Sequence, residues 1–403
     1  MTGVQVAILG IYAAIVAIWP IRLVVLEFIL RRQKVLSAAS PMFEERDPPL
    51  VSVILPAKDE ERNLAECLRS LCGLTYPNLE IVVVDDRSTD RTHEIALELA
   101  ATDPRIHVLA VEYLPPGWTG KTHALQYAFT VARGQWLLFV DADTLHAPES
   151  LAIMMEFARS QRAALVSLLP ELRCETFWEQ VVQPLAAITL MQSFPLHAVH
   201  DSRSRLAFAN GQYILVERSA YTATGGHASV RDRFVEDIAL AQRVKDLGRP
   251  IRVALVERIV TCRMYASLAE LARGWSRIFY DALSRNALRL LAKLLDPVIF
   301  CQTGHVAFLA ALILLPLGRS RMFTVGLLGL SIIHHALMFL LFQRVYRKSV
   351  AHSKYAAWFP VANLVIDLIL VRSIVMCLTG QVRWRGTAYE RLKDAEAVGA
   401  TKT

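Results

Sequence analysis

Four long apolar segments, one at the start of the chain and three near its end, restrict the fold more than any other feature. Residues 1–21 carry no charged side chain, and the apolar run continues almost to the basic cluster at residues 31–34. A run of this length can span a bilayer as a helix. Because the basic residues follow the run instead of preceding it, we expect a retained anchor with its C-terminal end in the cytoplasm.

The three C-terminal apolar segments do not define a single topology. Residues 297–318 and 322–343 are uncharged and predict a transmembrane hairpin. Residues 355–379 contain Asp367 and Arg372, so this segment either crosses with a buried charge pair or lies at the membrane interface. If all four segments crossed, the basic tail would fall on the outside, against the positive-inside rule. The sequence leaves both alternatives open.

The region between the apolar segments has ordinary polarity and alternates strand-like with helix-like stretches. Short apolar, β-branched runs occur at residues 48–56, 79–85, 106–111 and 136–141, each followed by a helical pattern. Buried strands that alternate with helices predict an α/β fold with a mostly parallel, Rossmann-like sheet. We therefore expect a transmembrane anchor at residues 1–30, a linker at 31–47, a globular domain at 48–285, a C-terminal membrane region with two to three transmembrane helices at 286–380 and a basic tail at 381–403.

The distribution of charge and the spacing of the cysteines limit the classes of binding partner and the redox state to be expected. The net charge of +7 is spread over the flanks of the apolar segments, which suits lipid headgroups. No basic stripe with interleaved aromatic residues occurs, so we expect no nucleic-acid partner. The six cysteines show no CxxC spacing and are expected to be reduced thiols in the cytosol.

Carboxylates follow the first two expected strands of the globular domain. Asp59 and Glu60 come after the first strand, and Asp85 and Asp86 end the second. In parallel sheets ligands bind at the carboxyl ends of the strands, and carboxylates there can accept hydrogen bonds from ribose hydroxyls or a base N–H. The alternative interpretation is that the acidic and hydroxyl side chains after Asp86 only cap the next helix.

Asp141 and Asp143 end the strand at residues 136–141. Two carboxylates at positions i and i+2 of a strand end project to the same side, so they can share one hard cation with diphosphate oxygens. The alternative is a solvated acidic turn. The position of this pair in the same series of strands and helices as Asp85 favours the cation site.

Two further motifs can serve a phosphate-containing substrate. Lys121 ends the glycine-flanked turn at residues 117–121 at a helix start, where its ammonium and free backbone N–H groups can meet phosphate. Glu236 and Asp237 precede a helical pattern over residues 238–247. Each motif has a structural alternative, a capping loop for the first and complementation of the helix dipole for the second.

This ordered set of motifs resembles the family 2 glycosyltransferases with a GT-A nucleotide-diphospho-sugar transferase fold, over about residues 48–285. Several short stretches extend the resemblance to membrane-bound glycosyltransferases of hopanoid-associated and carotenoid type: residues 114–121, 166–170, 177–179, 210–212, 225–227 and 384–386.

The resemblance implies a role for each of these motifs. Asp59 or Glu60 together with Asp86 would hold the nucleoside, with Asp85 beside them. Asp143 would bind a divalent cation, Mg²⁺ or Mn²⁺, with Asp141 close by. Asp237, with Glu236 next to it, would be the general base that deprotonates the acceptor hydroxyl, and Lys121 would meet the charge that develops on the diphosphate.

One motif departs from the pattern of the processive family members. These carry Gln-x-x-Arg-Trp, whereas this chain has Arg273, Trp275 and Arg277 without the glutamine. The resemblance makes Trp275 a candidate acceptor platform and places Arg273 or Arg277 on phosphate. The alternative for Trp275 is packing of an amphipathic helix at the membrane surface.

The sequence thus predicts an inverting, metal-dependent hexosyltransferase of the plasma (inner) membrane, with its catalytic domain in the cytoplasm. It would move one sugar from a nucleotide donor to a lipid hydroxyl, such as that of a hopanoid or carotenoid. A processive polysaccharide synthase and a non-catalytic nucleotide-binding scaffold are the alternatives.

Overall fold

The computed structural model describes residues 1–32, 35–318, 320–349, 352–384 and 387–390. The chain forms two compact units. We call residues 1–33, 174–190 and 265–403 the helical unit, and residues 34–173 and 191–264 the sheet unit. Residues 174–190 and 265–285 belong to the helical unit, although the sequence placed them within the globular domain.

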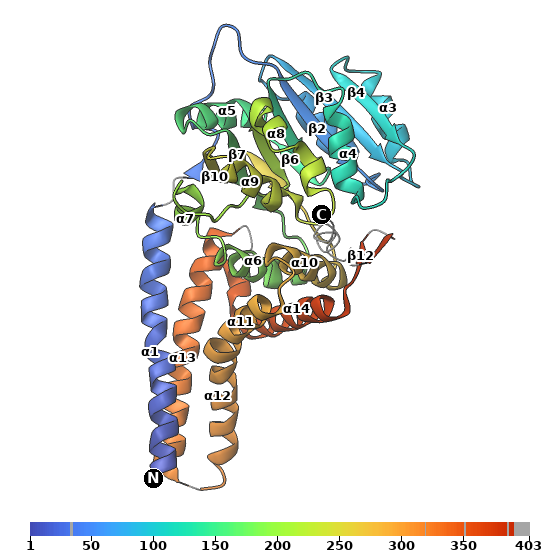
Figure 1. Cartoon of the computed structure of the whole chain (residues 1–403). Helices are drawn as coiled ribbons and strands as arrows, with labels where there is room; N and C mark the ends of the chain where they lie inside the picture. Colours follow the sequence, from blue (N-terminus) through green and yellow to red (C-terminus); the bar gives the residue numbers. More distant parts are fainter. Residues whose placement is uncertain (33–34, 319, 350–351, 385–386, 391–403) are drawn as a thin grey trace, which may run out of the picture. The chain divides into compact units, whose positions relative to one another are not determined.

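The sheet unit is built on an eight-stranded sheet in the order β1-β10-β7-β9-β5-β2-β3-β4 (Figure 1). Strand β9 is antiparallel to both of its neighbours, and the other adjacent pairs are parallel. The prediction of a mostly parallel α/β sheet is therefore confirmed. The strands are β1 (Val35–Leu36), β2 (Val51–Ala57), β3 (Leu79–Asp86), β4 (Ile106–Val111), β5 (Trp136–Val140), β7 (Leu165–Leu169), β9 (Tyr213–Glu217) and β10 (Ile251–Val256).

Helices cover both faces of this sheet because its central strands are apolar on both sides. Val51, Val53 and Leu55 of β2 pack in one core cluster with α2 (Leu64–Cys72) and α5 (Ser150–Ser160). Phe139 faces the other way, toward Tyr221, and Tyr221 also contacts Phe129 of α4 (Gly120–Phe129). The remaining elements of the unit are α3 (Thr92–Ala100), α7 (Leu196–His200), α8 (Arg218–Ala223), η1 (Gly226–Val230), α9 (Glu236–Asp246) and a small sheet of β6 (Thr144–His146), β11 (Val260–Cys262) and β8 (Glu171–Leu172).

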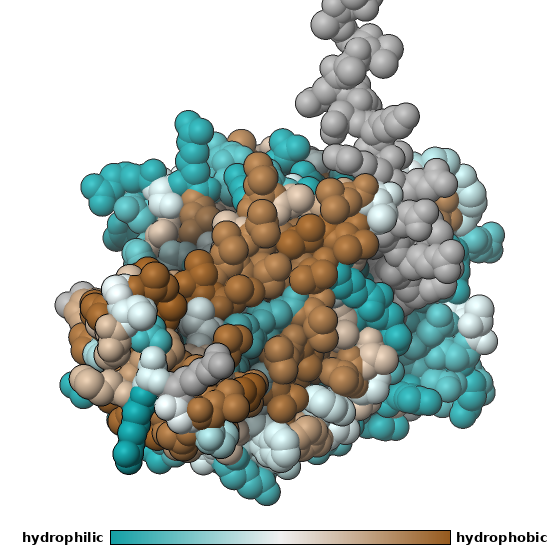
Figure 2. All heavy atoms as spheres, turned by 90° about the horizontal axis from the view of Figure 1, so that it is seen from below, coloured by the Kyte–Doolittle hydropathy of each residue, from teal (hydrophilic) through white to brown (hydrophobic). Residues whose placement is uncertain are grey.

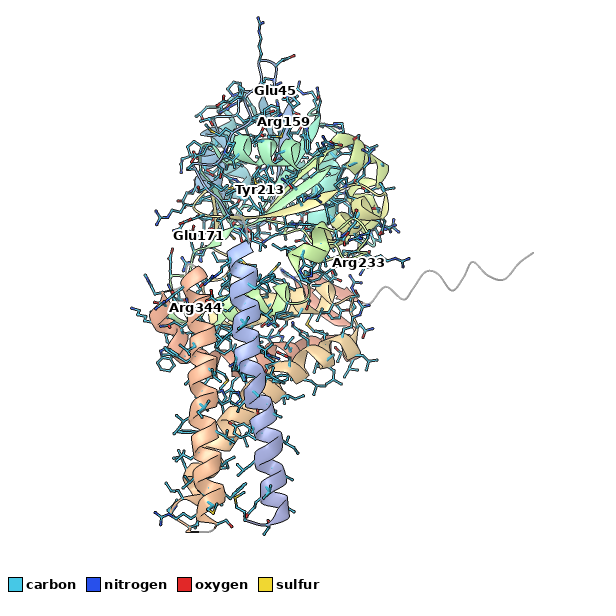
Figure 3. The ribbon with its side chains drawn as sticks, turned by 90° about the vertical axis from the view of Figure 1, so that its left-hand side faces the viewer. Glu45, Arg159, Glu171, Tyr213, Arg233 and Arg344 are labelled. Atoms are coloured by element: carbon cyan, nitrogen blue, oxygen red, sulfur yellow. The ribbon has the colours of Figure 1, made fainter. Side chains whose placement is uncertain are left out.

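Strand register brings several chain turns to one edge of the large sheet. Ala57 at the end of β2 pairs with Asp85 of β3, and Val140 at the end of β5 pairs with Tyr213 at the start of β9. Tyr213, labelled in Figure 3, lies within the sheet unit. The loops that follow β2, β3 and β5 therefore meet the turn that precedes β9.

Three helices of the helical unit run side by side: α1 (Gly3–Arg32), α12 (Thr303–Leu314) and α13 (Arg321–Lys348) (Figures 1 and 3). Their contact is apolar and includes Val16 of α1, Ala311 of α12 and Leu327 of α13. Near the C-terminal end of α13, Arg344 lies 3.3 Å from Glu27 of α1. Figure 3 labels Arg344 at this end of the bundle.

Helix α14 (Phe359–Thr379) runs crosswise to the three-helix bundle, along α10 (Leu268–Ala282) and α11 (Ala287–Pro297) (Figure 1). A π-helix, η2 (Val298–Gln302), connects α11 to α12. The other elements are α6 (Phe177–Met191), η3 (Ser353–Trp358) and the antiparallel strands β12 (Gln381–Trp384) and β13 (Thr387–Glu390). Most of the expected basic tail lies outside the described residues.

Four helical stretches are long and apolar enough to cross a membrane: Gly3–Arg31, Ala287–Leu314, Arg321–Arg347 and Ser353–Thr379. Apolar side chains cover much of the surface in Figure 2, which views the molecule from the free ends of the bundle. On α14 they form one stripe at helical spacing, made up of Leu364, Leu368, Val371, Val375 and Leu378, all exposed. The prediction of N- and C-terminal apolar helices that could span a membrane is confirmed.

Candidate active site

The site lies in the sheet unit, at the edge where strands β2, β3 and β5 end. Lys121 is its central cation. Its Nζ lies 2.7 Å from Asp141 Oδ1 and 2.8 Å from Glu236 Oε1. Lys121 takes this place because α4 begins just before it, with the Thr119 side chain accepting the Thr122 backbone N–H as the N-cap. The turn therefore caps α4, as the structural alternative expects, and Lys121 on it is ion-paired; its contact with phosphate stays a prediction.

Asp141 and Asp143 lie on the turn between β5 and β6. The Thr144 hydroxyl donates to the Asp141 carbonyl at 2.7 Å, which stabilises the turn. Asp141 faces Lys121, whereas Asp143 Oδ1 is buried and has no hydrogen-bond partner within the described part of the chain. Burial and the charges of Asp141 and Glu60 raise the pKa of Asp143 to about 7. A buried carboxylate beside two others is an environment that a cation stabilises.

Glu236 and Asp237 begin α9. Asp237 is held by two backbone donors: the Gly211 N–H donates to Oδ2 at 2.6 Å and the Ile238 N–H donates to Oδ1 at 2.7 Å. Despite these bonds, burial and the adjacent Glu236 carboxylate raise the pKa of Asp237 to about 7. A carboxylate with this pKa exchanges a proton near neutral pH, as a general base must.

Burial and the neighbouring carboxylates have opposite effects on the pKa of Lys121. Burial alone would lower the pKa of its ammonium, but Asp141 and Glu236 outweigh burial and raise the pKa above its usual range. Lys121 is therefore a permanent positive charge between two carboxylates. Such a charge can meet the phosphates of a bound nucleotide without changing its own protonation state.

The acidic residues after β2 and β3 form a linked pair of loops. Asp59, in the left-handed region with φ 52°, accepts hydrogen bonds from the Thr89 backbone N–H at 2.8 Å and from the Thr89 hydroxyl at 3.2 Å. Asp86 Oδ1 accepts from Arg87 Nε at 2.8 Å. Glu60 is buried, and its Oε2 accepts from Asn63 Nδ2 at 2.8 Å.

Asp85 serves the structure of the same loop. Its Oδ1 accepts the Ser88 backbone N–H at 3.2 Å, and its Oδ2 lies 3.4 Å from His93 Nδ1. Asp85 thus contacts the residues that follow it in the chain, whereas the Asp86 carboxylate is directed toward the start of α4. A methyl group at Gly120 would come within 2.1 Å of Asp86 Oδ2, which locates that oxygen beside the helix start.

Three sequence-predicted residues belong to the other unit. Arg273, Trp275 and Arg277 lie on α10 in the helical unit. Trp275 is 4% exposed, its indole N–H donates to Gln183 Oε1 at 2.8 Å, and its ring packs against Phe279. These contacts are those of a packed helix, the alternative that the sequence left open for Trp275.

Several site residues were not predicted from the sequence. A Cβ on Gly211 would lie 3.1 Å from both Asp237 Oδ2 and Lys121 Nζ, so only glycine fits there without displacement. Cys262 lies beside Asp143, and its Sγ accepts from Gln212 Nε2 at 2.7 Å. His227, buried against Phe139 and bonded to the Tyr221 hydroxyl, is part of the core. The resemblance marked the stretches 210–212 and 225–227, which contain Gly211, Gln212 and His227, whereas Cys262 was noted only as a thiol.

Known proteins are similar to the part of the chain that carries most of this site. Residues 52–221, which contain β2 to β9 and therefore Asp86, Lys121, Asp141 and Asp143, match the sequence model described as "Glycosyl transferase family 2". This match to family 2 glycosyltransferases covers less than half of the chain. The predicted resemblance to the family 2 glycosyltransferases is confirmed over residues 52–221, and Glu236 and Asp237 lie beyond the matched segment.

Two curated relatives of this chain carry the name 4,4'-diaponeurosporenoate glycosyltransferase. A 4,4'-diaponeurosporenoate glycosyltransferase of Staphylococcus haemolyticus is 28% identical over 232 residues, which cover 56% of this chain and 60% of that protein. The protein of the same name from Staphylococcus aureus is 26% identical over 267 residues, covering 66% of this chain and 68% of that protein. The first match thus spans well under two thirds of the relative's length.

Among solved structures, a mannosyltransferase from Pyrobaculum calidifontis, in complex with GDP-mannose and Mn²⁺, has a TM-score of 0.57. It is 19% identical, and the match covers 92% of this chain and 98% of that one. This similarity confirms the predicted GT-A fold of the chain. The Mn²⁺ belongs to that structure, and within the described residues here no group of three or more His, Cys, Asp or Glu side chains forms a metal site by itself.

The residues nevertheless fit a divalent cation that is completed by its substrate. Asp143 offers a buried oxygen that has no partner among the residues that the structure describes, and Asp141 lies on the same turn. Carboxylate oxygens are the preferred ligands of Mg²⁺, which commonly uses one or two carboxylates together with substrate phosphates. A protein-only cluster of three or more ligands is therefore not required.

Proposed function

We propose that this protein is an inverting, metal-dependent hexosyltransferase that moves a single sugar from a nucleoside diphosphate donor to the hydroxyl group of a membrane lipid. The observation that carries the proposal is the convergence on Lys121 of Asp141 and Glu236, with Asp143 and Asp237 on the same two loops. One loop follows β5, and the other leads into α9. A donor diphosphate and an acceptor hydroxyl need such oppositely charged neighbours.

Asp237 is the proposed general base. Its carboxylate is fixed by the backbone N–H groups of Gly211 and Ile238, and its lone pairs outnumber these two bonds. With a pKa of about 7 it takes the proton of the acceptor hydroxyl as the oxygen attacks the anomeric carbon. Direct displacement of the nucleoside diphosphate inverts that carbon, and the proton remains on the Asp237 carboxyl until it passes to solvent.

Lys121 is the proposed partner of the leaving diphosphate. The ammonium remains charged throughout and lies between the Asp141 and Glu236 loops, so it can stabilise the negative charge that develops on the leaving group. A divalent cation held by Asp143 and Asp141 would supply further positive charge to the same phosphates. Asp86, Asp59 and Glu60 are proposed to hold the nucleoside, because their loops end the two preceding strands.

The lipid acceptor is supported by the helical unit and by the relatives. Helix α14 exposes a continuous apolar stripe, and α11 exposes Leu288, Leu291 and Leu295 at helical spacing. Relatives with 28% and 26% identity are named for a carotenoid acid as acceptor. We propose a polyisoprenoid lipid with a hydroxyl group, such as a hopanoid or carotenoid.

We further propose that three helices cross the plasma membrane and that α14 lies at its cytoplasmic face. Helix α14 runs crosswise to the bundle of α1, α12 and α13 (Figure 1). With three crossings, Arg31, Arg344, Lys354 and the basic tail all fall on the same side as the catalytic domain, which satisfies the positive-inside rule. Of the two topologies open from the sequence, this one leaves only the short basic stretch at residues 319–321 on the outer side.

A panel of labelled nucleotide sugars tests the proposal. Membranes that contain the wild type or Asp143→Asn are incubated with each donor and total bacterial lipid, with Mn²⁺, Mg²⁺ or a chelator. We expect one sugar to enter a solvent-extractable lipid, the chelator to abolish transfer, and Asp143→Asn to lower it at least tenfold. Asp246→Asn is the matched control, because Asp246 is exposed at the other end of α9.

The product decides between the alternatives. An anomeric configuration opposite to that of the donor supports inversion, and retention overturns it. Label in a high-molecular-weight polymer would support a processive synthase, and donor binding without any transfer would support a scaffold.

A further inference from the structure

A group of polar side chains lies within the helical unit, where α14 meets η2 and the start of α12. We call Gln302, His305, His335, Asn363 and Asp367 the polar cluster. Gln302 Nε2 donates to Asp367 Oδ2 at 2.6 Å, and His305 Nδ1 lies 2.9 Å from His335 Nε2. The cluster therefore joins η2, α12, α13 and α14. None of its members belongs to the sheet unit, which holds the proposed catalytic residues.

The hydrogen bonds define the tautomers of the two histidines. His335 Nδ1 lies 2.8 Å from the Ser331 carbonyl, which can only accept, so Nδ1 carries the proton. In neutral His335, Nε2 is then an acceptor, and His305 must donate to it from Nδ1. His305 Nε2 is consequently an acceptor in the neutral ring, and it is buried with no partner among the described residues.

Two more buried atoms of the cluster lack a hydrogen-bond partner among the described residues. Asn363 Nδ2 is a donor and Asp367 Oδ1 is an acceptor, and neither has a hydrogen-bond partner in the described part of the chain. Asn363 is 4% exposed. A buried polar atom without a hydrogen bond lowers the stability of the fold where water is excluded. Ionisable side chains within apolar helices commonly mark functional sites.

The three open atoms share one region of the unit. Asn363 and Asp367 are four residues apart on α14 and therefore project from the same face. Phe359, one turn earlier on that face, has its ring 5.9 Å from the His305 ring. Gln302, which bonds Asp367, is three residues before His305 and closes the π-helix η2. Segments of π-helix occur frequently at functional sites.

We propose that the polar cluster binds the hydroxyl group of a lipid alcohol. A hydroxyl accepts from Asn363 Nδ2 while it donates its single proton to Asp367 Oδ1 or His305 Nε2, so it satisfies one open donor and one open acceptor at once. An anionic headgroup would be repelled by Asp367, and an ammonium group would leave the Asn363 donor without a partner. The chemistry of the cluster therefore selects a neutral hydroxyl.

The surroundings favour a lipid over water as the source of this hydroxyl. Asp367 and His305 are partly exposed, and the neighbouring surface of α14 is the apolar stripe. A molecule that reaches the cluster along this surface must itself be apolar over most of its length. The inference rests on the proposed function only in taking a lipid alcohol as the acceptor. The cluster is a binding site for that alcohol separate from the position at which Asp237 would deprotonate its hydroxyl.

Binding without a donor tests the site separately from transfer. The full chain in phosphatidylcholine nanodiscs is titrated with phytol, with phytane, which lacks the hydroxyl, and with phytyl methyl ether, which can accept but not donate. Native mass spectrometry counts the bound ligand. We expect phytol to bind about tenfold more tightly than phytane, with the ether between them.

Two substitutions test the named atoms. Asn363→Leu removes the donor at similar volume and should bring phytol down to the affinity of phytane. Asp367→Asn keeps an oxygen for Gln302 but replaces the open acceptor by an amide donor, so the preference for phytol over its methyl ether should narrow. Thr303→Val is the matched control, because the Thr303 hydroxyl donates to the backbone carbonyl of Ile299, four residues earlier, and to no member of the cluster among the described residues.

Equal binding of phytol and phytane to the wild type would overturn the proposal, since water would then fill the cluster. A preference for phytol that survives both substitutions would also overturn it. If Asn363→Leu does not fold, as judged by its elution and thermal unfolding, the ether comparison with Asp367→Asn remains decisive. Selective phytol binding without transfer from any nucleotide sugar would refute the proposed function and leave this inference intact.

Discussion

The Lys121 ammonium lies 2.8 Å from the Glu236 carboxylate, although the two residues start helices that are far apart in the sequence. Asp141, after β5, completes the contact on the other side at 2.7 Å. The loops that carry the proposed cation ligands and the proposed base are thus held together by one side chain. Lys121 has a structural role in addition to its proposed role at the diphosphate.

Lys121→Met should destabilise the sheet unit as well as weaken donor binding. The substitution leaves the Asp141 and Glu236 carboxylates facing one another without a cation, which costs about 3 kcal/mol for a largely buried pair. We expect the apparent melting temperature of the full chain in detergent to fall by about 5 °C or more. The exposed Arg243 on α9 supplies the control Arg243→Met, which should change it little. An unchanged melting temperature in Lys121→Met would show that the two ion pairs of Lys121 do not stabilise the folded protein.

Asp237→Asn should abolish transfer while donor binding remains. The amide preserves the size of the side chain and an oxygen for the Gly211 or Ile238 N–H, but it cannot take the acceptor proton. Loss of a general base typically lowers the rate by about 10²- to 10⁴-fold. Single-turnover transfer measures the rate, and isothermal titration with the donor measures binding. Full activity in Asp237→Asn would assign the base to another residue.

The sequence predicted the strands well because buried parallel strands are continuous apolar runs. The run at residues 79–85 became β3 (Leu79–Asp86), and residues 106–111 became β4 (Ile106–Val111). The antiparallel insertion of β9 between β5 and β7 was not predicted, since its apolar pattern carries no direction. The edge strand β1 was also missed, because two residues within an expected linker form no pattern.

For the site, the sequence identified the charged residues but not how they pair. Runs such as Asp141 to Asp143 are visible locally, whereas the approach of Glu236 to Lys121 depends on the packing of α9. Gly211 was missed for the same reason, since the lack of space for a Cβ is a property of the tertiary structure. Trp275 shows the reverse case: its sequence context suits both a ligand platform and a packed helix, and its buried bond to Gln183 is that of the packed helix.

Transfer should rise with pH across the neutral range. The pKa of Asp237 is raised to about 7, so the carboxyl is protonated and inactive as a base below this value and becomes active above it. We expect kcat/KM to fall about tenfold for each pH unit below the pKa and to level off above it. A profile that is flat between pH 5.5 and 8 would contradict this assignment.

The effect of Mn²⁺ on the pH profile of kcat/KM distinguishes the titration of Asp143 from that of Asp237. Its pKa is also raised to about 7, and protons compete with a cation for its carboxylate. Raising the Mn²⁺ concentration should therefore move only the Asp143 part of the profile to lower pH, while the limb due to Asp237 stays in place. Profiles at limiting and saturating Mn²⁺ measure the two parts.

Gly211→Ala should impair catalysis with little effect on folding. The added Cβ would lie 3.1 Å from Asp237 Oδ2 and 3.1 Å from Lys121 Nζ, closer than side chains normally pack, so the base and the ammonium must both move by a few tenths of an ångström. Because catalytic groups are sensitive to small misplacement, we expect kcat to fall about tenfold or more. Donor affinity should change less, since the Asp86 loop is not displaced.

Gly73→Ala is the matched control for this substitution. A Cβ on Gly73 would have its nearest contacts at 3.5 Å, to the carbonyl oxygens of Arg69 and Ser70, which is an ordinary packing distance. Its backbone, with φ −78°, suits alanine without strain. Steady-state kinetics of the two variants at saturating donor and acceptor compare them directly. Equal kcat values for Gly211→Ala, Gly73→Ala and the wild type would mean that the position of Asp237 does not limit transfer, and the general-base assignment would have to be abandoned.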